Sequence, residues 1–242
     1  MATAFVIDGA YFLRRFGRTF PQYPADDAKA VAVGLQWLTF WHLSQRNRLP
    51  APAVQAAIEQ GLRLEESPDL YRIFFYDCPP LEKKLHYPIS KRPLDLSRTS
   101  TAVFRKSVHR EIGRIRKAAL RFGRLNEDFA WRLKPDALKR LLKNSDTFEP
   151  EDDDFEHDVK QKGVDMRLGL DVASLAFKRQ VDQIVLVAAD GDFVPAAKLA
   201  RREGIDVVLD PMGGTAAKDL VEHVDGVRNC PGSNAIMPLH LA

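Results

Sequence analysis

Short apolar runs alternate along the chain with longer segments whose apolar residues recur at helical spacing. Residues 4–7 and 184–189 are uninterrupted apolar runs with β-branched side chains, a pattern typical of strands buried on both faces of a parallel sheet. Together these segments predict an α/β fold with a mainly parallel sheet flanked by helices. Further strands are expected at residues 72–77, 125–133, 155–162 and 204–209, and helical segments at residues 11–18, 26–47, 53–64, 101–121, 135–143, 166–177 and 193–203.

Aspartates follow two of the expected strands directly. Asp8 comes after residues 4–7, and Asp190 and Asp192 come after residues 184–189. The carboxyl ends of parallel strands open on one edge of a sheet, so aspartates that are distant in sequence meet there. Carboxylates held close together repel one another unless a cation neutralises them, and hard oxygen ligands suit Mg²⁺ or Mn²⁺. The pattern therefore predicts a divalent-metal pocket.

Helix capping is a simpler explanation for some of these acids. Asp192 and Asp165 each precede a helical segment, and either one alone is more simply interpreted as a cap. Capping does not account for Asp190, which adds repulsion that helix formation does not need. Nor does it account for Asp8, where Gly9 lets the backbone turn closely around a bound group. The combination favours a site, with Asp77 and Asp210, at other strand ends, expected at its outer rim.

Charge is distributed unevenly along the 242 residues. Residues 83–143 hold 18 Lys and Arg against 5 Asp and Glu, whereas residues 146–242 hold 10 against 19. A basic segment beside an acidic metal pocket suits a polyanionic substrate, because cations hold phosphates while the metal acts on one of them. A solvated helix face is an equally good interpretation of the following basic residues: Arg105, Lys106, Arg110, Arg114, Arg116, Lys117, Arg121 and Arg124.

Length and composition favour a single domain over residues 1–230, with a basic helical insertion at about 83–145 and a tail at 231–242. No run approaches the ~20 apolar residues of a membrane span, so no membrane association and a cytoplasmic location are expected. Residues 83–100, with prolines and no clear period, are expected to form a surface loop. Cys78 and Cys230 lack the spacing of a zinc site or disulfide framework and are expected to be reduced thiols.

Four segments together resemble the NYN family, the LabA-like branch of the PIN-like nucleases. They are Phe5-Val6-Ile7-Asp8-Gly9, Lys160 to Asp165, Val187 to Phe193, and the closing strand Gly204 to Asp210. The resemblance implies a three-layer PIN-like (Rossmann-like) fold and a ribonuclease that uses Mg²⁺ or Mn²⁺ to hydrolyse phosphodiester bonds. Under it, the catalytic and metal-binding acids are Asp8, Asp165, Asp190 and Asp192.

RNA, single-stranded or structured, is the partner that this resemblance implies, and a homodimer is a possible assembly. The residues expected to contact RNA are Tyr11, Arg14, Lys162, Arg110, Arg114, Arg116 and Lys117. Tyr11 stands where the family commonly carries asparagine; a tyrosine can stack on a base or bond a phosphate, but it cannot replace the amide's paired donor and acceptor. A non-catalytic RNA-binding or regulatory adaptor with the same fold is therefore the alternative.

Two other enzyme classes are disfavoured. A haloacid-dehalogenase-type phosphatase would carry a second acid two residues after Asp8, where this chain has Ala10. A dinucleotide-binding enzyme would need a glycine-rich first turn, and Gly9 alone is insufficient.

Overall fold

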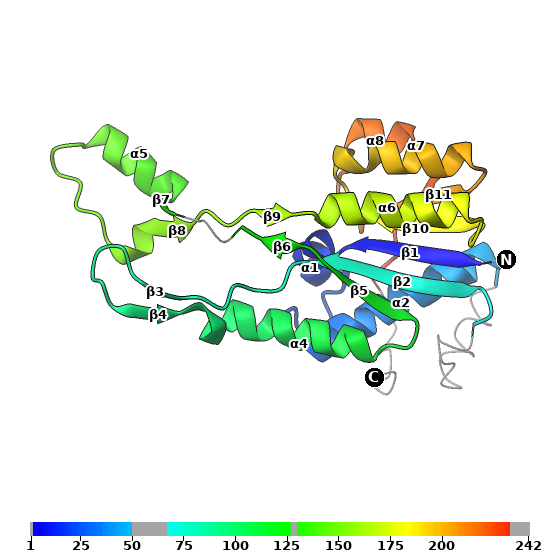
Figure 1. Cartoon of the computed structure of the whole chain (residues 1–242), viewed down its shortest axis with the longest axis horizontal. Coiled ribbons are helices and arrows are strands. Elements are labelled where there is room, and N and C mark those ends of the chain that lie inside the picture. The colour runs from blue at the N-terminus through cyan, green and yellow to red at the C-terminus, as the bar shows by residue number, and fades with distance from the viewer. Residues whose placement is uncertain (1, 50–66, 127–129, 233–242) are drawn as a thin grey trace.

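A six-stranded parallel sheet forms the centre of the protein. The computed structural model describes residues 2–49, 67–126 and 130–232. The strands lie in the order β12-β11-β10-β1-β2-β5, and every neighbouring pair is parallel (Figure 1). Their bounds are Thr3–Asp8 (β1), Leu70–Asp77 (β2), Ala118–Phe122 (β5), Gln183–Val187 (β10), Asp206–Asp210 (β11) and Gly226–Val227 (β12).

Helices cover both faces of this sheet. Their bounds are Gly9–Thr19 (α1), Ala28–Arg46 (α2), Ser100–Arg114 (α4), Val164–Phe177 (α6), Val194–Arg202 (α7) and Lys218–Glu222 (α8). Short 3-10 helices lie at Leu96–Arg98 (η2) and Gly191–Phe193 (η4). Side-chain caps set two of the helix starts: Asp27 accepts a hydrogen bond from the N–H of Lys29 at α2, and Thr99 accepts one from the N–H of Ala102 at α4.

The alternation of side chains along β1 separates two hydrophobic cores. Phe5 and Ile7 point to one face and pack with the side chains of α1, α2 and α4. Ala4 and Val6 point to the other face and pack with α6, α7 and α8. All four residues are fully buried, as expected for a central strand covered on both faces. The three-layer α/β organisation predicted from the sequence is confirmed.

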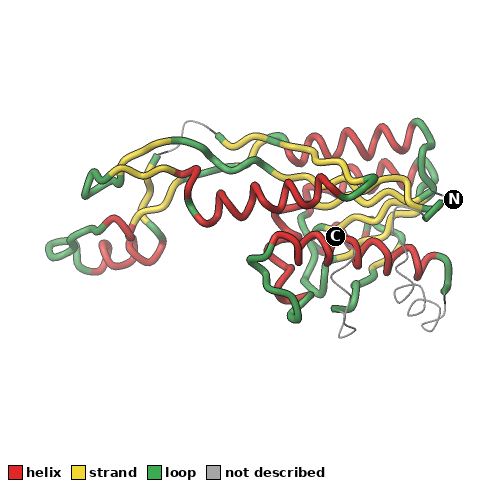
Figure 2. The backbone as a smooth tube through the Cα atoms, turned by 90° about the horizontal axis from the view of Figure 1, so that it is seen from below, coloured by secondary structure: helices red, strands yellow, loops and turns green. Residues whose placement is uncertain are grey.

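A long arm extends from the carboxyl edge of the sheet. Its described residues are 79–95, which follow β2, and 124–126 and 130–162, which follow β5 and lead into α6. Figure 2 shows it from below, projecting away from the helices of the body. Its elements are Lys84–His86 (β3), Pro93–Asp95 (β4), Arg124–Leu125 (β6), Trp131–Leu133 (β7), Pro135–Lys143 (α5), Asp152–Asp154 (η3), Phe155–His157 (β8) and Gln161–Lys162 (β9).

Three antiparallel pairs, β3–β4, β6–β9 and β7–β8, stiffen the arm. The two segments are joined at Asp152, whose carboxylate accepts hydrogen bonds from the N–H groups of Ile89 and Ser90 at 3.0 and 3.1 Å. In the β7–β8 pair further out along the arm, the ring centroids of Trp131 and His157 lie 3.8 Å apart. The arm is therefore an ordered structure built from both segments.

Several predicted elements differ from the structure. The expected helix 101–121 ends at Arg114, because the chain turns at Lys117, where φ is 64°, and then forms β5 on the edge of the main sheet. The basic helical insertion at 83–145 is therefore not one unit: α4 and β5 belong to the body, whereas β3, β4, β6, β7 and α5 belong to the arm. The expected surface loop 83–100 contains the β3–β4 hairpin, and 155–162 forms two short strands rather than one.

The predicted helix at 53–64 and most of the tail at 231–242 lie outside the described residues. Cys78 and Cys230 are unpaired and buried, and burial raises the pKa of the Cys78 thiol to about 11. Among the described residues, no helix has the length and apolar character needed to cross a bilayer.

Candidate metal centre

The four predicted acids lie beside the carboxyl edge of the central strands. Asp8 ends β1, and Asp190 and Asp192 follow β10, where Asp190 caps η4 by accepting a hydrogen bond from the N–H of Asp192 at 3.2 Å. Asp165 stands in the first turn of α6. β1 and β10 are hydrogen-bonded neighbours, so their ends hold Asp8 and Asp190 on the same edge.

Asp8 is half-buried at the end of its strand. Its carboxylate accepts a hydrogen bond from the N–H of Tyr11 at 3.1 Å and so caps α1. Burial is the main cause that raises the pKa of Asp8, with the negative charge of Asp165 adding to it; the Tyr11 N–H and the Arg14 guanidinium oppose the rise. Asp8 therefore serves both as a helix cap and as part of a repulsive acidic group.

Asp165 is electrostatically coupled to all the other three acids. Burial raises its pKa most, followed by the negative charges of Asp192 and Asp190, and Asp165 in turn raises the pKa of Asp8. A left-handed turn at Gly163, with φ of 78°, brings the chain into α6. Six residues further along α6, Asp171 fixes the helix to the sheet by accepting hydrogen bonds from Tyr76 and Arg121, both at 2.9 Å.

The donor chemistry of this acidic cluster, defined as Asp8, Asp165, Asp190 and Asp192, matches a hard divalent cation. It offers carboxylate oxygens, and the pKa values of Asp8 and Asp165 are raised mainly by burial and further by the neighbouring negative charges, both of which a bound cation would offset. Among the described residues, no group of three or more histidine, cysteine, aspartate or glutamate side chains lies close enough together to hold a metal ion as it stands. The metal role of the acidic cluster is therefore taken up below as a proposal.

Asp77 and Asp210 do not form the outer rim predicted for them. Both are fully buried, and each is bonded to a histidine from the helices on one face: Asp77 to His109 and Asp210 to His42, each at 2.8 Å. Burial alone would raise the pKa of Asp77, but the His109 hydrogen bond and the Arg105 guanidinium outweigh it and hold the pKa below its ordinary value. These two aspartates connect the covering helices to the sheet.

Tyr11 cannot stack on a base as predicted. Its ring is 5% exposed, and its hydroxyl donates a hydrogen bond to the carbonyl of Pro211 at 2.6 Å. A Cβ on Gly214 would lie 2.6 Å from that hydroxyl, so the tyrosine fits only because residue 214 is glycine. Tyr11 therefore packs α1 against the loop after β11. The neighbouring Arg14 is exposed, lies over the Tyr11 ring and is close enough to lower the pKa of Asp8.

The basic residues predicted on α4 lie away from the acidic cluster. Arg110 and Arg114 both bond to Glu111, and the Lys117 ammonium donates to the carbonyls of Ser67 and Leu70. The chain from Arg114 leads directly into the start of β5, so Arg114, Arg116 and Lys117 stand at the amino edge of the sheet, opposite the acids (Figure 1). The end of α4 therefore does not lie beside the acidic cluster, and the contact of these residues with nucleic acid stays a prediction.

Lys162 has a setting that the sequence alone did not reveal. In the β6–β9 pair at the base of the arm, Lys162 stands directly opposite Arg124, and both side chains are exposed. Like charges in facing positions of an antiparallel pair are destabilising unless an anion lies between them. Lys162 is three residues before Asp165, so this cationic pair adjoins the acidic cluster. Only the pairing of β6 with β9 reveals this cationic pair, because the charge count along the sequence does not show which residues face each other.

The profile of the NYN domain family matches residues 107–228. The matched segment covers half of the chain and includes Asp165, Asp190 and Asp192, while Asp8 lies before it. The chain belongs to the NYN domain family. This is a PIN-like nuclease family, and the parallel sheet with helices on both faces agrees with its fold.

Two individual relatives are also similar. An uncharacterized protein of Methanocaldococcus jannaschii, MJ0482, is 30% identical over 73 residues, which cover 29% of this chain and 30% of that protein. The chain thus matches less than a third of the length of this curated relative. A crystal structure of a protein of unknown function, VPA0982 from Vibrio parahaemolyticus, covers 93% of this chain and 90% of its own, at 12% identity and a TM-score of 0.41.

Proposed function

We propose that this NYN protein is a Mg²⁺- or Mn²⁺-dependent ribonuclease that hydrolyses RNA phosphodiester bonds at the acidic cluster. The observation that carries the proposal is the coupling of Asp165 to Asp8, Asp190 and Asp192, which gathers four negative charges from three segments of the NYN fold. Such mutual repulsion destabilises a protein, and a cation that binds the folded state offsets it.

Bound divalent ions would supply a water of lowered pKa and would neutralise the charge on the leaving oxygen. The chain's own residues position the reaction. The Tyr11 N–H orients Asp8, the Asp192 N–H orients Asp190, and Asp171 holds α6 so that Asp165 faces the same edge. The ligands that we assign to the metal are the four carboxylates of the acidic cluster.

Arg124 and Lys162 are proposed to hold the RNA backbone next to the cleaved bond. Their two exposed cations face each other and form a site for one phosphate. Unlike the basic residues at the end of α4, they lie next to the acidic cluster. Arg14, beside Asp8, is a further candidate for a phosphate contact. Tyr11 has no such role in this proposal.

A cleavage assay tests the proposal. Purified protein is incubated with single-stranded and hairpin RNAs in Mg²⁺, Mn²⁺ or a chelator, beside Asp190→Asn and the control Asp26→Asn, an exposed aspartate outside the cluster. We expect ion-dependent cleavage that Asp190→Asn lowers at least 100-fold and Asp26→Asn leaves unchanged. Removing one group that stabilises a transition state electrostatically typically lowers the rate by roughly 10²–10³.

Arg124→Glu with Lys162→Glu separates binding from chemistry. This pair should weaken RNA binding and make it less sensitive to salt, because two cations that hold the backbone are lost, while the melting temperature should stay close to the wild-type value because one facing like-charge pair replaces another. If the wild-type protein cuts no RNA with either ion but still binds RNA through these residues, the adaptor with a NYN fold becomes the better account.

A further inference from the structure

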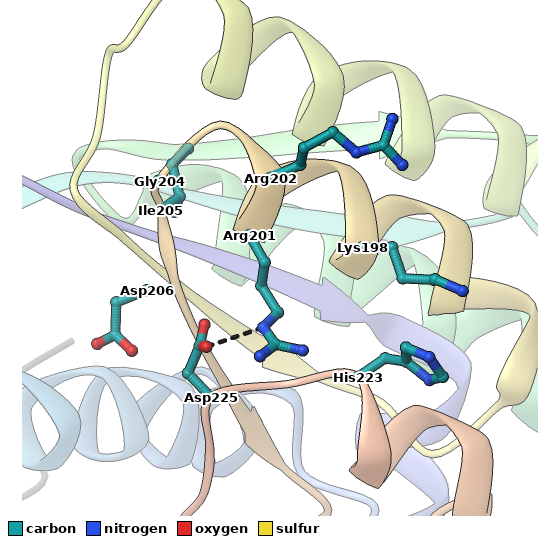
Figure 3. Close-up of a pocket in the computed structure, with 8 residues that line it drawn as sticks. All are labelled: Lys198, Arg201, Arg202, Gly204, Ile205, Asp206, His223 and Asp225. Carbon is teal, nitrogen blue, oxygen red and sulfur yellow. Dashed lines mark hydrogen bonds and ion pairs between the residues drawn. The ribbon is translucent and has the colours of Figure 1, made fainter.

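A second charged hollow lies on the other side of the molecule from the arm. It has a volume of about 680 Å³ and is formed by the C-terminal half of α7, the turn between α8 and β12, and the start of β11. Lys198, Arg201, Arg202 and His223 line it, and Figure 3 shows the Arg201 guanidinium beside Asp225, with the Arg202 side chain extending away from Arg201 and His223. It lies at the amino edge of β11 and shares no residue with the acidic cluster.

The acids of this hollow are already bonded, whereas much of its positive charge is not. Asp206 accepts a hydrogen bond from the Gln183 side chain at 2.6 Å. Asp225 accepts from the Arg201 Nε and from the Val207 N–H, both at 2.8 Å, which orients the guanidinium and leaves its two terminal nitrogens open.

Lys198 and Arg202 have no ion-pair partner within the part of the chain that the structure describes, and both are exposed. The His223 Nδ1–H donates to the Asp219 carbonyl at 2.7 Å, so its Nε2 is turned outward. The hollow therefore offers a net positive set of groups to an anion.

Helix-dipole compensation explains only part of this arrangement. Cations in the last turn of a helix are favourable by about 0.3–1 kcal/mol, which accounts for Arg201 and Arg202 at the end of α7. Lys198 stands in the middle of the nine-residue helix, and His223 comes from a different element. Neither is needed to offset the dipole of α7, and their meeting around one hollow calls for an anionic ligand.

The exposed face of α7 connects this hollow to the acidic cluster. Asp192 lies in η4, directly before α7, and the exposed residues Pro195, Lys198 and Arg202 follow it along one face of the helix. At 1.5 Å per residue, Arg202 is roughly 15 Å from Asp192 along the axis. Successive phosphates of a stacked strand advance about 3.4 Å along the helix axis, so a strand lying along α7 in this form covers the distance with about four nucleotides.

We propose that the hollow lined by Lys198, Arg201, Arg202 and His223 binds the phosphate backbone of RNA about four nucleotides from the bond held at the acidic cluster. This inference rests on the proposed function, because it takes RNA as the substrate. It adds a second, remote backbone site that would make the enzyme favour strands long enough to reach along α7.

The test compares Lys198→Glu/Arg202→Glu with Lys178→Glu/Arg179→Glu, a double charge reversal just after α6 at two exposed residues that do not line this hollow. Affinity for a 4-nucleotide and a 20-nucleotide RNA is measured by fluorescence anisotropy in chelator, across a range of salt. We expect the first variant alone to bind the long RNA more weakly, with a slope of log K against log salt reduced by about 1.4 for two lost single-strand contacts. The short RNA should not distinguish the variants.

Equal affinities and slopes in the two variants would overturn the proposal. A third measurement follows the His223 ring signals by NMR as inorganic phosphate is added: if free phosphate shifts them but RNA affinity does not depend on Lys198 and Arg202, the hollow binds small anions and not RNA. The readout is independent of catalysis. If the wild-type protein cuts no RNA but Lys198→Glu/Arg202→Glu still weakens its binding of the long RNA, the hollow is upheld as an RNA site and only the proposed ribonuclease activity is rejected.

Discussion

Removing the charge of Asp165 should stabilise the metal-free protein. Asp165 is the acid that is coupled to the other three, so Asp165→Asn relieves three repulsive contacts at once. Each interaction between partly exposed charges in water is on the order of 0.2–1 kcal/mol, so three of them give roughly 0.6–3 kcal/mol, with about 1–2 kcal/mol as the central expectation. For a chain of this size, that corresponds to a rise in melting temperature of about 2–8 °C.

The assay is thermal unfolding in chelator and in Mn²⁺, with Asp26→Asn as the matched control. For the wild type, an ion at 100 times its dissociation constant should add about 2.7 kcal/mol. In Asp165→Asn, this increment should shrink while the chelator value rises, and the control should show neither change. A lower melting temperature in chelator, together with an undiminished Mn²⁺ increment, would refute the reasoning about mutual repulsion.

The remaining predictions concern pH and the buried contacts. The pKa values of Asp8 and Asp165 are raised in the folded state above the ordinary value of about 3.8, so their ionisation destabilises the folded protein fully above the raised values and not at all below the ordinary one. The free energy of unfolding of the metal-free protein, measured with urea, should therefore increase as the pH falls through that window. Asp165→Asn should make this increase smaller. Gly214→Ala should cost about 1–3 kcal/mol by overpacking against the Tyr11 hydroxyl, and a background of Tyr11→Phe should reduce that cost in a double-mutant cycle; equal costs in both backgrounds would disprove the contact. His42→Leu should cost about 1–3 kcal/mol in urea unfolding, because the buried Asp210 carboxylate loses one hydrogen-bond partner and keeps the N–H groups of Met212 and Cys230; a variant as stable as the wild type would contradict this.

The central sheet could be predicted because its signal is local. The runs at residues 4–7 and 184–187 are apolar at every position, which only a strand covered on both faces requires. The position of Asp8 and Asp190 at strand ends followed from the same runs, since parallel strands share a carboxyl edge.

The arm and the role of Tyr11 could not be predicted, because their causes are not local. β6 and β9 are two residues each, too short for any period, and only their pairing places Arg124 opposite Lys162. Tyr11 bonds to Pro211, two hundred residues away in sequence. The charge count found the basic segment but assumed one helix, whereas the turn at Lys117 sends part of it to the far edge of the sheet.

The chemistry of the cleaved ends tests the central claim most directly. RNA is cut in H₂¹⁸O with Mn²⁺, and the products are weighed by mass spectrometry beside those from Asp190→Asn. Hydrolysis at the acidic cluster predicts one ¹⁸O in each new terminal phosphate, no cyclic phosphate, and no product with the variant or with chelator. Cyclic phosphate ends, cleavage that persists in chelator, or the absence of any cleavage would contradict the account.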